Sequence, residues 1–212
     1  MNQANRALII GASDDVPARA PSTCGSLVIC ADGGLHHAQR WGITPHVVVA
    51  DLDSAVGDVE GWCREHGVEF LRFPVEKDKT DSELAVDTAL ARGATALTLT
   101  GVWGGRVDHS LANLGLVYRL AQAGTQAEIL TGSARLFSLC GTATLELEVG
   151  QVISLLPLTE TCRGVTIQGV YYPLRNASLR RGSTLGVSNV AVAEVVEVTC
   201  AEGVLLVVLP QK

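Results

Sequence analysis

Short apolar runs alternate with amphipathic segments through the first 130 residues of the chain. Residues 7–10, 27–30 and 46–50 are apolar almost without interruption, which is typical of strands buried on both faces. Residues 35–41 and 111–121 instead carry apolar side chains at helical spacing. This alternation predicts an α/β fold whose N-terminal part is a mostly parallel sheet with helices on both faces and right-handed crossovers.

The middle of this half adds elements with recognisable boundaries. They are a helix over residues 56–66, strands over residues 69–73 and 94–100, and a long helix that ends at Arg92. Thr80 and Glu83 have the spacing of a capping box, which marks the start of the long helix. The capping box places Asp78 just before that helix and Asp81 in its first turn.

After about Leu130 the pattern changes to short Val- and Leu-rich runs separated by Gly, Pro or Asn, without a convincing helix. The predicted strands cover residues 142–149, 152–156, 165–167 and 190–198. Such spacing is typical of a small antiparallel sandwich or barrel. We therefore expect two packed domains, an α/β domain over residues 1–132 and a smaller all-β domain over residues 133–212.

Composition and charge narrow the possible functions. Hydrophobic residues make up 47% of the 212 residues and charged residues 18%, which indicates a globular chain. The formal net charge is −6 and no basic run is present, so neither a nucleic acid nor an anionic membrane is an expected partner. A negatively charged protein that handles phosphates needs local Arg and Lys side chains and a metal ion.

The six cysteines form no C-x-x-C pair and have no histidine at zinc spacing, so we expect free thiols and no structural zinc. The N-terminal apolar run is too short for a signal peptide, and residues 204–209 are too few to span a bilayer. These features favour a cytoplasmic protein.

Carboxylates gather where the predicted parallel strands end, the edge at which open α/β sheets bind ligands. Asp51 and Asp53 stand one residue apart after a buried strand, so both can reach one cation, and oxygen ligands of this kind suit Mg²⁺. Such residues are also common in strand-end turns, and a charged loop is usually a solvated surface. Six carboxylates in one cleft would repel each other, which favours a divalent cation. They are Asp32, Asp51, Asp53, Asp78, Asp81 and Asp108.

A glycine-rich turn connects the strand that ends near Thr100 to the helix that follows it. Gly104 and Gly105 precede Arg106, with Asp108 and His109 two and three residues further on. A strand, a glycine turn and a helix in this order leave backbone N–H groups unpaired, which favours anion binding. Arg106 adds donors matched to phosphate oxygens. The alternative is a tight turn in which Asp108 only caps the helix.

A metal, an arginine and a backbone anion site together indicate phosphoryl-type transfer. The chain has neither the G-x-x-x-x-G-K-[ST] motif nor the loop set of protein kinases. If the protein uses ATP, it does so through another architecture.

Six ordered blocks of the sequence resemble the thiamine pyrophosphokinase family, and the likeness spans nearly the whole chain. The blocks are ADGG at residues 31–34, DLDS at 51–54, KDKTD at 77–81, GGRVDHSLAN at 104–113, GVYYPL at 169–174 and LGVSN at 185–189. One departure is Ala50, where the family usually has Gly before the paired aspartates. Alanine disfavours a positive φ, so this departure affects the backbone geometry of the loop that carries Asp51 and Asp53.

The resemblance implies transfer of the diphosphate of ATP to the hydroxyl of thiamine, which gives thiamine diphosphate and AMP. It implies Mg²⁺ on Asp51, Asp53 and Asp81, and a homodimer with the thiamine site between two subunits. The implied ATP-binding residues are Asp32, Gly33, Asp78, Lys79, Thr80, Gly104, Gly105 and His109, and the implied catalytic residues are Asp81, Arg106 and Asp108. The thiamine-binding residues would be Tyr172, Ser188 and Asn189.

Several points stay open in the sequence. Either Asp108 or Asp81 can be the carboxylate that accepts the hydroxyl proton, and His109 can simply be packed in the first helical turn. One alternative function is another Mg²⁺-dependent diphosphokinase or a nucleotide hydrolase. Another is a non-catalytic nucleotide- or vitamin-binding module, although such a module is expected to have lost acidic positions that this chain retains.

Overall fold

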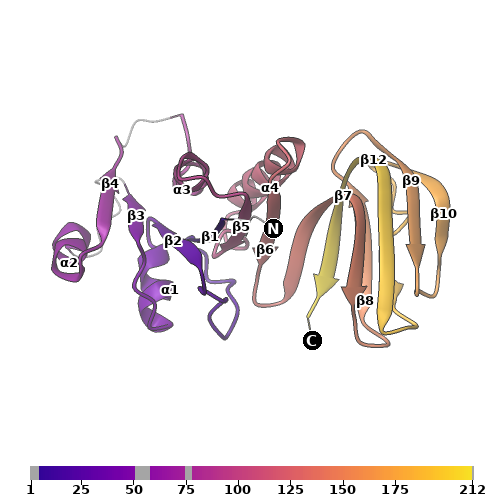
Figure 1. Ribbon diagram of the computed structural model, residues 1–212, viewed down its shortest axis with the longest axis horizontal. Coiled ribbons are helices and arrows are strands. Elements are labelled where there is room, and N and C mark those ends of the chain that lie inside the picture. Colours follow the sequence, from indigo (N-terminus) through magenta and orange to yellow (C-terminus); the bar gives the residue numbers. More distant parts are fainter. Residues whose placement is uncertain (1–4, 51–57, 75–77, 212) are drawn as a thin grey trace. The chain divides into compact units, whose positions relative to one another are not determined.

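The computed structural model describes residues 5–50, 58–74 and 78–211, which form a mixed α/β fold with a large sheet and few helices (Figure 1). The chain divides into two compact units. The first unit comprises Met1–Leu116 and Thr125–Gly132, and the second comprises Val117–Gly124 and Ser133–Lys212. All six cysteines carry free thiols, as predicted. Among the described residues, no helix combines the length and the apolar character needed to cross a bilayer.

The strands of the first unit run in the order β6-β5-β1-β2-β3-β4, and each pairs with its neighbours in parallel. They are β1 Arg6–Ile10, β2 Ser26–Ala31, β3 Val47–Ala50, β4 Glu69–Arg72, β5 Ala96–Thr100 and β6 Gln126–Leu130. Because parallel strands end at one edge, the segments that follow β1, β2 and β5 lie together there.

Four helices occur in the described residues. They are α1 Gly34–Arg40, α2 Val59–His66, α3 Asp81–Ala91 and α4 Val107–Gln122. Thr80 is the N-cap of α3, and its Oγ1 accepts a hydrogen bond from the N–H of Glu83 at 3.2 Å, which confirms the capping prediction. Asp58 caps α2 in the same way, because its Oδ1 accepts from the N–H of Gly61 at 2.7 Å.

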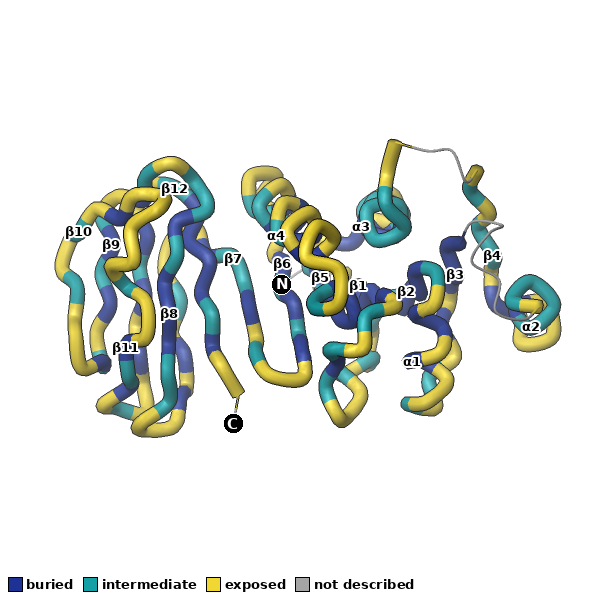
Figure 2. The backbone as a smooth tube through the Cα atoms, turned by 180° about the vertical axis from the view of Figure 1, so that it is seen from behind, coloured by how far each residue is buried: buried dark blue, intermediate teal, exposed yellow. Residues whose placement is uncertain are grey.

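The core of the first unit lies on its central strands (Figure 2). The four consecutive residues Ala7, Leu8, Ile9 and Ile10 of β1 are only 0–2% exposed, so both faces of this strand are covered. Burying a Leu or Ile side chain fully stabilises the fold by about 1.5–3 kcal/mol. Helices α1 and α3 both pack against β1 and β2.

The second unit is built from antiparallel strands around its own apolar core. They are β7 Ala134–Glu146, β8 Val152–Pro157, β9 Thr161–Gln168, β10 Leu174–Arg180, β11 Asn189–Val190 and β12 Val195–Pro210. The long strand β12 pairs with β7 along its length, with β9 through its first half and with β8 through Leu205–Val208. A register shift between Cys200 and Leu205 separates the two halves of β12.

Candidate active site

Asp32 follows β2 directly and has a left-handed backbone with φ of 50°. A non-glycine residue in this region costs on the order of 1 kcal/mol and persists only where its surroundings fix it. The N–H of Asp32 donates to the carbonyl of Val49 at 2.7 Å, so the ladder between β2 and β3 holds this residue from one side. The half-buried Asp32 therefore has a defined position at the edge of the sheet.

The turn after Asp32 is compact because α1 begins directly beside the end of β1. Gly33 is the N-cap of α1, and Gly34 is its first residue. A Cβ atom on Gly34 would lie 1.9 Å from the carbonyl oxygen of Ile10, so only glycine fits at this position. The two glycines bring the chain after Asp32 against the loop that follows β1.

The glycine turn, residues 101–105, follows β5 at the same edge, and Gly104 and Gly105 have φ of 85° and 65°. Three side chains hold its backbone. Asn113 Nδ2 donates to the carbonyl of Val102 at 2.7 Å, and the hydroxyl of Ser13 donates to the carbonyl of Trp103. Ser110 Oγ accepts from the N–H of Gly104 at 3.0 Å. The prediction of unpaired N–H groups is therefore wrong for Gly104, because Ser110 already uses that donor.

Sequence reasoning gave no role to Ser13, Ser110 or Asn113. Ser110 and Asn113 are 7% and 3% exposed, although both residue types are usually found at the surface. Their spacing of three within GGRVDHSLAN places both on one face of α4, and this was the signal available in the sequence. The contact between Ser13 and Trp103 spans 90 positions, so no local pattern indicates it.

Arg106 and Asp108 form a two-point ion pair. Arg106 Nη2 lies 2.6 Å from Asp108 Oδ2, and Arg106 Nε lies 3.2 Å from Oδ1. The hydrogen bonds from Arg106 lower the pKa of Asp108 to about 2, and those from Asp108 raise the pKa of the guanidinium. Both side chains are about two-thirds exposed, at 69% and 65%. The fork of Arg106 thus binds the two oxygens of a carboxylate, and it can bind two oxygens of a phosphate in the same bidentate way.

Asp108 lies in the first turn of α4, which begins at Val107, so it is not the residue before the helix. The neighbouring His109 is exposed, and it is therefore not packed into the core. Arg106, Asp108 and His109 all face solvent where the glycine turn ends. This arrangement leaves the three side chains accessible to a ligand.

The segment before α3 presents polar residues, with Asp78 exposed and Thr80 used as the cap. Asp81 stands in the first turn of the helix, as the capping box predicts. Lys79 Nζ lies 2.7 Å from Asp87 Oδ2, so this predicted ATP-binding residue is paired with a carboxylate of α3. An exposed pair of this kind contributes about 0–1 kcal/mol and can be exchanged for a ligand.

Asp51, Asp53 and Lys77 lie outside the described residues. Within the described ranges, no group of three His, Cys, Asp or Glu side chains is placed to hold a metal ion. Ala50, the residue before Asp51, is the last residue of β3 and pairs with Arg72. Its φ is not positive. Strand geometry accommodates alanine there, so the geometry of this residue does not require glycine.

The three predicted thiamine-binding residues lie in the second unit, and one of them fixes another. Asn189 is 5% exposed, its Oδ1 accepts from the N–H of Tyr172 at 3.0 Å, and its Nδ2 donates to the carbonyl of Tyr172 at 2.7 Å. Tyr172 is 67% exposed and meets Tyr171 edge to face with ring centroids 4.8 Å apart. Ser188 is exposed and left-handed, with φ of 58°. Both polar atoms of the Asn189 amide are therefore bonded to the backbone of Tyr172. Asn189 thus positions the exposed Tyr172 and does not offer an open amide to a ligand.

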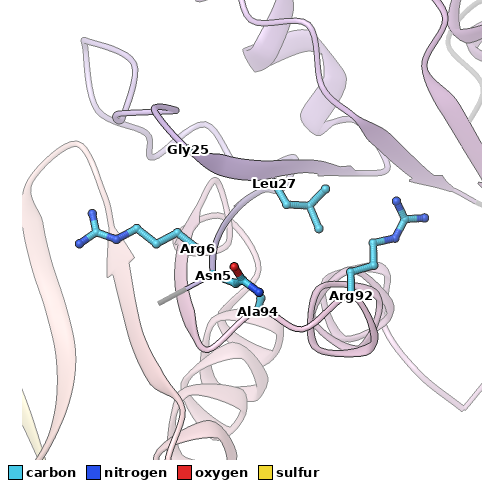
Figure 3. Close-up of a pocket in the computed structure, with 6 residues that line it drawn as sticks. All are labelled: Asn5, Arg6, Gly25, Leu27, Arg92 and Ala94. Carbon is cyan, nitrogen blue, oxygen red and sulfur yellow. The ribbon is translucent and has the colours of Figure 1, made fainter. Parts of the chain in front are cut away.

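A cavity of about 300 Å³ opens at the other edge of the first unit's sheet (Figure 3). It is lined by Asn5, Arg6, Gly25, Leu27, Arg92 and Ala94. These residues belong to the beginnings of β1 and β2 and to the end of α3, whereas Asp32 and the glycine turn follow the strand ends. Arg92 is already bound to both carboxylate oxygens of Glu69 at 2.8 Å. This cavity is therefore not part of the candidate site.

His37 lies in α1, near the backbone of Ser13 in the loop after β1, and its Nδ1 is buried without a hydrogen-bond partner among the described residues. The side chain is 3% exposed. Burial lowers the pKa of His37, and the nearby charges of Arg40 and His36 lower it further, while the Ser13 backbone and Asp14 act in the opposite direction. Burial thus favours the neutral form of the His37 imidazole.

The lowered pKa of His37 predicts a loss of stability in mild acid. The unfolded chain binds a proton at its ordinary pKa of 6.5, whereas the folded chain binds it only at lower pH. The free energy of unfolding should therefore fall as the pH drops below about 6.5. Urea unfolding at a series of pH values tests this expectation. His37→Gln should weaken this dependence and the exposed control His66→Gln should keep it, and an equal dependence in His37→Gln and the parent would contradict it.

Comparisons with known proteins match both halves of the chain. The family model of the thiamin pyrophosphokinase catalytic domain matches residues 23–129, and that of the thiamin pyrophosphokinase vitamin B1 binding domain matches residues 142–205. Thiamine pyrophosphokinase of Bacillus subtilis is 28% identical over 169 residues, which cover 79% of each chain. Thiamine pyrophosphokinase 1 of Oryza sativa subsp. japonica is 25% identical over 82% of this chain and 75% of its own.

Solved structures agree with these matches. The crystal structure of thiamin pyrophosphokinase from Geobacillus thermodenitrificans has a TM-score of 0.81 and 28% identity over 98% of each chain. That of the Bacillus subtilis protein has a TM-score of 0.85 and 24% identity over 98% of this chain and 100% of its own, which supports the fold. Together these features define an α/β transferase of the kinase class. The chain belongs to the thiamin pyrophosphokinase family, whose enzymes make thiamine diphosphate.

Proposed function

We propose that this chain transfers the diphosphate of ATP to the hydroxyl of thiamine, which gives thiamine diphosphate and AMP. The observation that carries the proposal is the joint match of one chain to a catalytic and a vitamin B1 binding domain. The catalytic match covers Asp32, Arg106 and Asp108, and the vitamin match covers Tyr172 and Asn189. The phosphate chemistry and the acceptor are thus assigned to different parts of the chain.

The proposed division of labour follows the two halves. Residues 1–132, a mostly parallel sheet with helices on both faces, would bind nucleotide and metal. Residues 133–212 would bind thiamine and form the dimer. The parallel pairing of β1 to β6 and the antiparallel pairing of β7 to β12 support this division.

Arg106 is the proposed contact to the transferred group. Its fork holds both carboxylate oxygens of Asp108, and two oxygens of a phosphate are an equally matched partner. When Arg106 turns to the phosphate, Asp108 loses the hydrogen bonds that lower its pKa and becomes a better proton acceptor. Asp108 would then take the proton of the thiamine hydroxyl as its oxygen attacks the β-phosphorus, and AMP would leave in line. Asp81 is the alternative acceptor.

The proposed metal ligands are Asp51, Asp53 and Asp81. An all-carboxylate donor set fits Mg²⁺, which binds oxygen ligands and retains water and phosphate oxygens at its other positions. When bound, the ion would neutralise charge on the phosphate oxygens.

A homodimer with a shared thiamine site is the proposed assembly. The second unit exposes several large apolar side chains, namely Tyr171, Tyr172, Leu185, Val187 and Val192. The bridge between Val170 and Ala191 and the hydrogen bond from the Tyr171 N–H to Val190 place two of these segments side by side. Exposed apolar side chains on neighbouring segments are typical of protein interfaces. Native mass spectrometry gives the subunit number, and a monomer at micromolar concentration would contradict the proposal.

Product analysis tests the reaction. The protein is incubated with ATP, Mg²⁺ and thiamine, and the nucleotide product is identified by chromatography. Formation of AMP that requires thiamine supports diphosphate transfer, whereas ADP indicates a simple kinase. AMP without thiamine would indicate a nucleotide hydrolase, and binding of either compound without turnover would indicate a non-catalytic module.

Replacing Asn189 by alanine should weaken thiamine binding and spare ATP binding. The change removes both hydrogen bonds that hold the Tyr172 backbone and leaves its part-buried N–H and C=O groups unpaired, which costs about 1–3 kcal/mol. Thiamine affinity should fall roughly five- to a hundredfold. Calorimetric titration of each ligand measures this, with the exposed Thr142→Ala as control. Weaker ATP binding with intact thiamine binding would reverse the assignment of the two halves.

A further inference from the structure

Strand β8 carries one buried hydroxyl in an otherwise apolar sequence, VISLLP. Ser154 is 7% exposed, and a hydroxyl buried without a partner is unfavourable. Its Oγ accepts a hydrogen bond from the backbone N–H of Ser188 at 2.9 Å, across 34 positions of sequence. The hydroxyl of Ser154 is thus bonded to one residue of the proposed acceptor site.

Ser188 needs such a partner because of its backbone. Its φ of 58° lies in the left-handed region, which a serine adopts only where the surroundings fix it. Strand β8 holds the segment on both sides of this residue, since the Leu155 N–H donates to the carbonyl of Gly186 at 2.9 Å and Asn189 pairs with Ile153. Ser154 lies between Ile153 and Leu155 on β8, and its hydroxyl binds the N–H of Ser188 directly.

The same segment positions the tyrosines. Asn189 follows Ser188 and binds the backbone of Tyr172 through both its amide oxygen and its amide nitrogen. A shift of Ser188 out of its left-handed conformation would therefore change the direction of the chain that carries Asn189. The exposed Ser188 and Tyr172 would both be displaced.

We propose that Ser154 is a positioning residue for the thiamine site, acting through the backbone of Ser188. The proposal rests on the proposed function, in which Tyr172 and Ser188 bind thiamine and Asn189 holds the backbone of Tyr172. Ser154 itself touches no substrate. Its hydroxyl keeps Ser188 in the one conformation that presents the acceptor site.

The test compares two nearly isosteric variants, Ser154→Thr and Ser154→Val, which suit a strand equally and differ by the hydroxyl. Steady-state AMP formation gives KM for thiamine and for ATP separately. Ser154→Val should raise the thiamine KM about five- to a hundredfold and leave the ATP KM within about twofold, because the part-buried N–H of Ser188 loses its acceptor. Ser154→Thr should keep the thiamine KM within about threefold of the parent, since the acceptor oxygen remains.

Thr142→Val is the matched control, because it removes an exposed hydroxyl bonded to Thr199 on another strand of the unit. It should leave both KM values unchanged. A second measurement uses the background Ser188→Gly, in which glycine adopts a positive φ freely. In that background Ser154→Val should raise the thiamine KM less than it does in the parent.

Two results would overturn the proposal. One is an equal thiamine KM for Ser154→Thr and Ser154→Val, and the other is an equal rise of both KM values in Ser154→Val. Either would reduce Ser154 to a core residue without a role in the thiamine site. Failure of the proposed function is distinguishable, because the parent protein would then form no thiamine-dependent AMP.

Discussion

Asp53→Asn and Asp51→Asn should each abolish turnover at limiting Mg²⁺ while the fold stays intact. Both residues follow β3, and both belong to the block that resembles the metal-binding aspartates of the family. Asparagine keeps the size of the side chain and removes its charge, so the attraction to a divalent cation is weakened. Loss of one such ligand should reduce activity by at least about a hundredfold. AMP formation as a function of Mg²⁺ concentration measures the effect, and thermal unfolding reports on the fold.

Asp58→Asn is a matched control for this prediction, because it makes the same chemical change a few residues further on. Asp58 caps α2, and asparagine is an equally good N-cap, so both activity and stability should remain. Activity near that of the parent in both Asp51→Asn and Asp53→Asn would remove these residues from the metal site. Mg²⁺-independent AMP formation by the parent would reject the metal itself.

Much of the first unit could be predicted from the sequence because its strands are buried on both faces. Continuous apolar runs predicted β1, β2 and β3 to within two residues, and the capping box predicted the first residue of α3. Strand β6, QAEIL, was not predicted. It is short, and its buried Ala127 and Ile129 alternate with less buried residues, so it lacks the continuous run that marked the others.

The second unit was predicted less well because tertiary contacts decide where its strands end. Residues 190–198 were expected to be one strand, but β11 ends at Val190 and β12 begins at Val195. Between these strands, the Val192 N–H donates to the carbonyl of Gly169, so it does not pair with a neighbouring strand of the sheet. In contrast, β12 continues through Ala201–Gly203, which interrupt its apolar run, because the pairing with β7 changes register between Cys200 and Leu205.

The candidate site shows the same limit. The end of an apolar run indicated Asp32, but nothing in the sequence indicates its left-handed backbone, which depends on the neighbouring strand. The role of Asn189 changed most in the structure, because its amide binds the Tyr172 backbone instead of standing open. Long-range hydrogen bonds of this kind, which no local pattern in the sequence indicates, decide what these side chains do.

Arg106→Ala should lower kcat by about 10²–10³-fold, and Arg106→Lys by about tenfold or more. Lysine keeps the charge but offers a single point of contact, whereas Arg106 uses both Nε and Nη2 toward Asp108 and would use the same fork toward phosphate. Steady-state AMP formation gives kcat, and calorimetry gives the ATP affinity. Arg92→Lys is the control, since Arg92 binds Glu69 away from the candidate site and should tolerate the change.

A second readout of Arg106 does not depend on turnover. Arg106 lowers the pKa of Asp108 from an ordinary value of 3.8 to about 2, so Arg106→Ala should return this pKa toward 3.8. NMR titration of the Asp108 carboxyl group follows the change. Addition of ATP to the parent should raise the same pKa, because the guanidinium leaves Asp108 for the phosphate. If ATP leaves the Asp108 pKa at its ligand-free value and Arg106→Lys matches the parent in kcat, the pair with Asp108 is structural and Arg106 does not contact the transferred group.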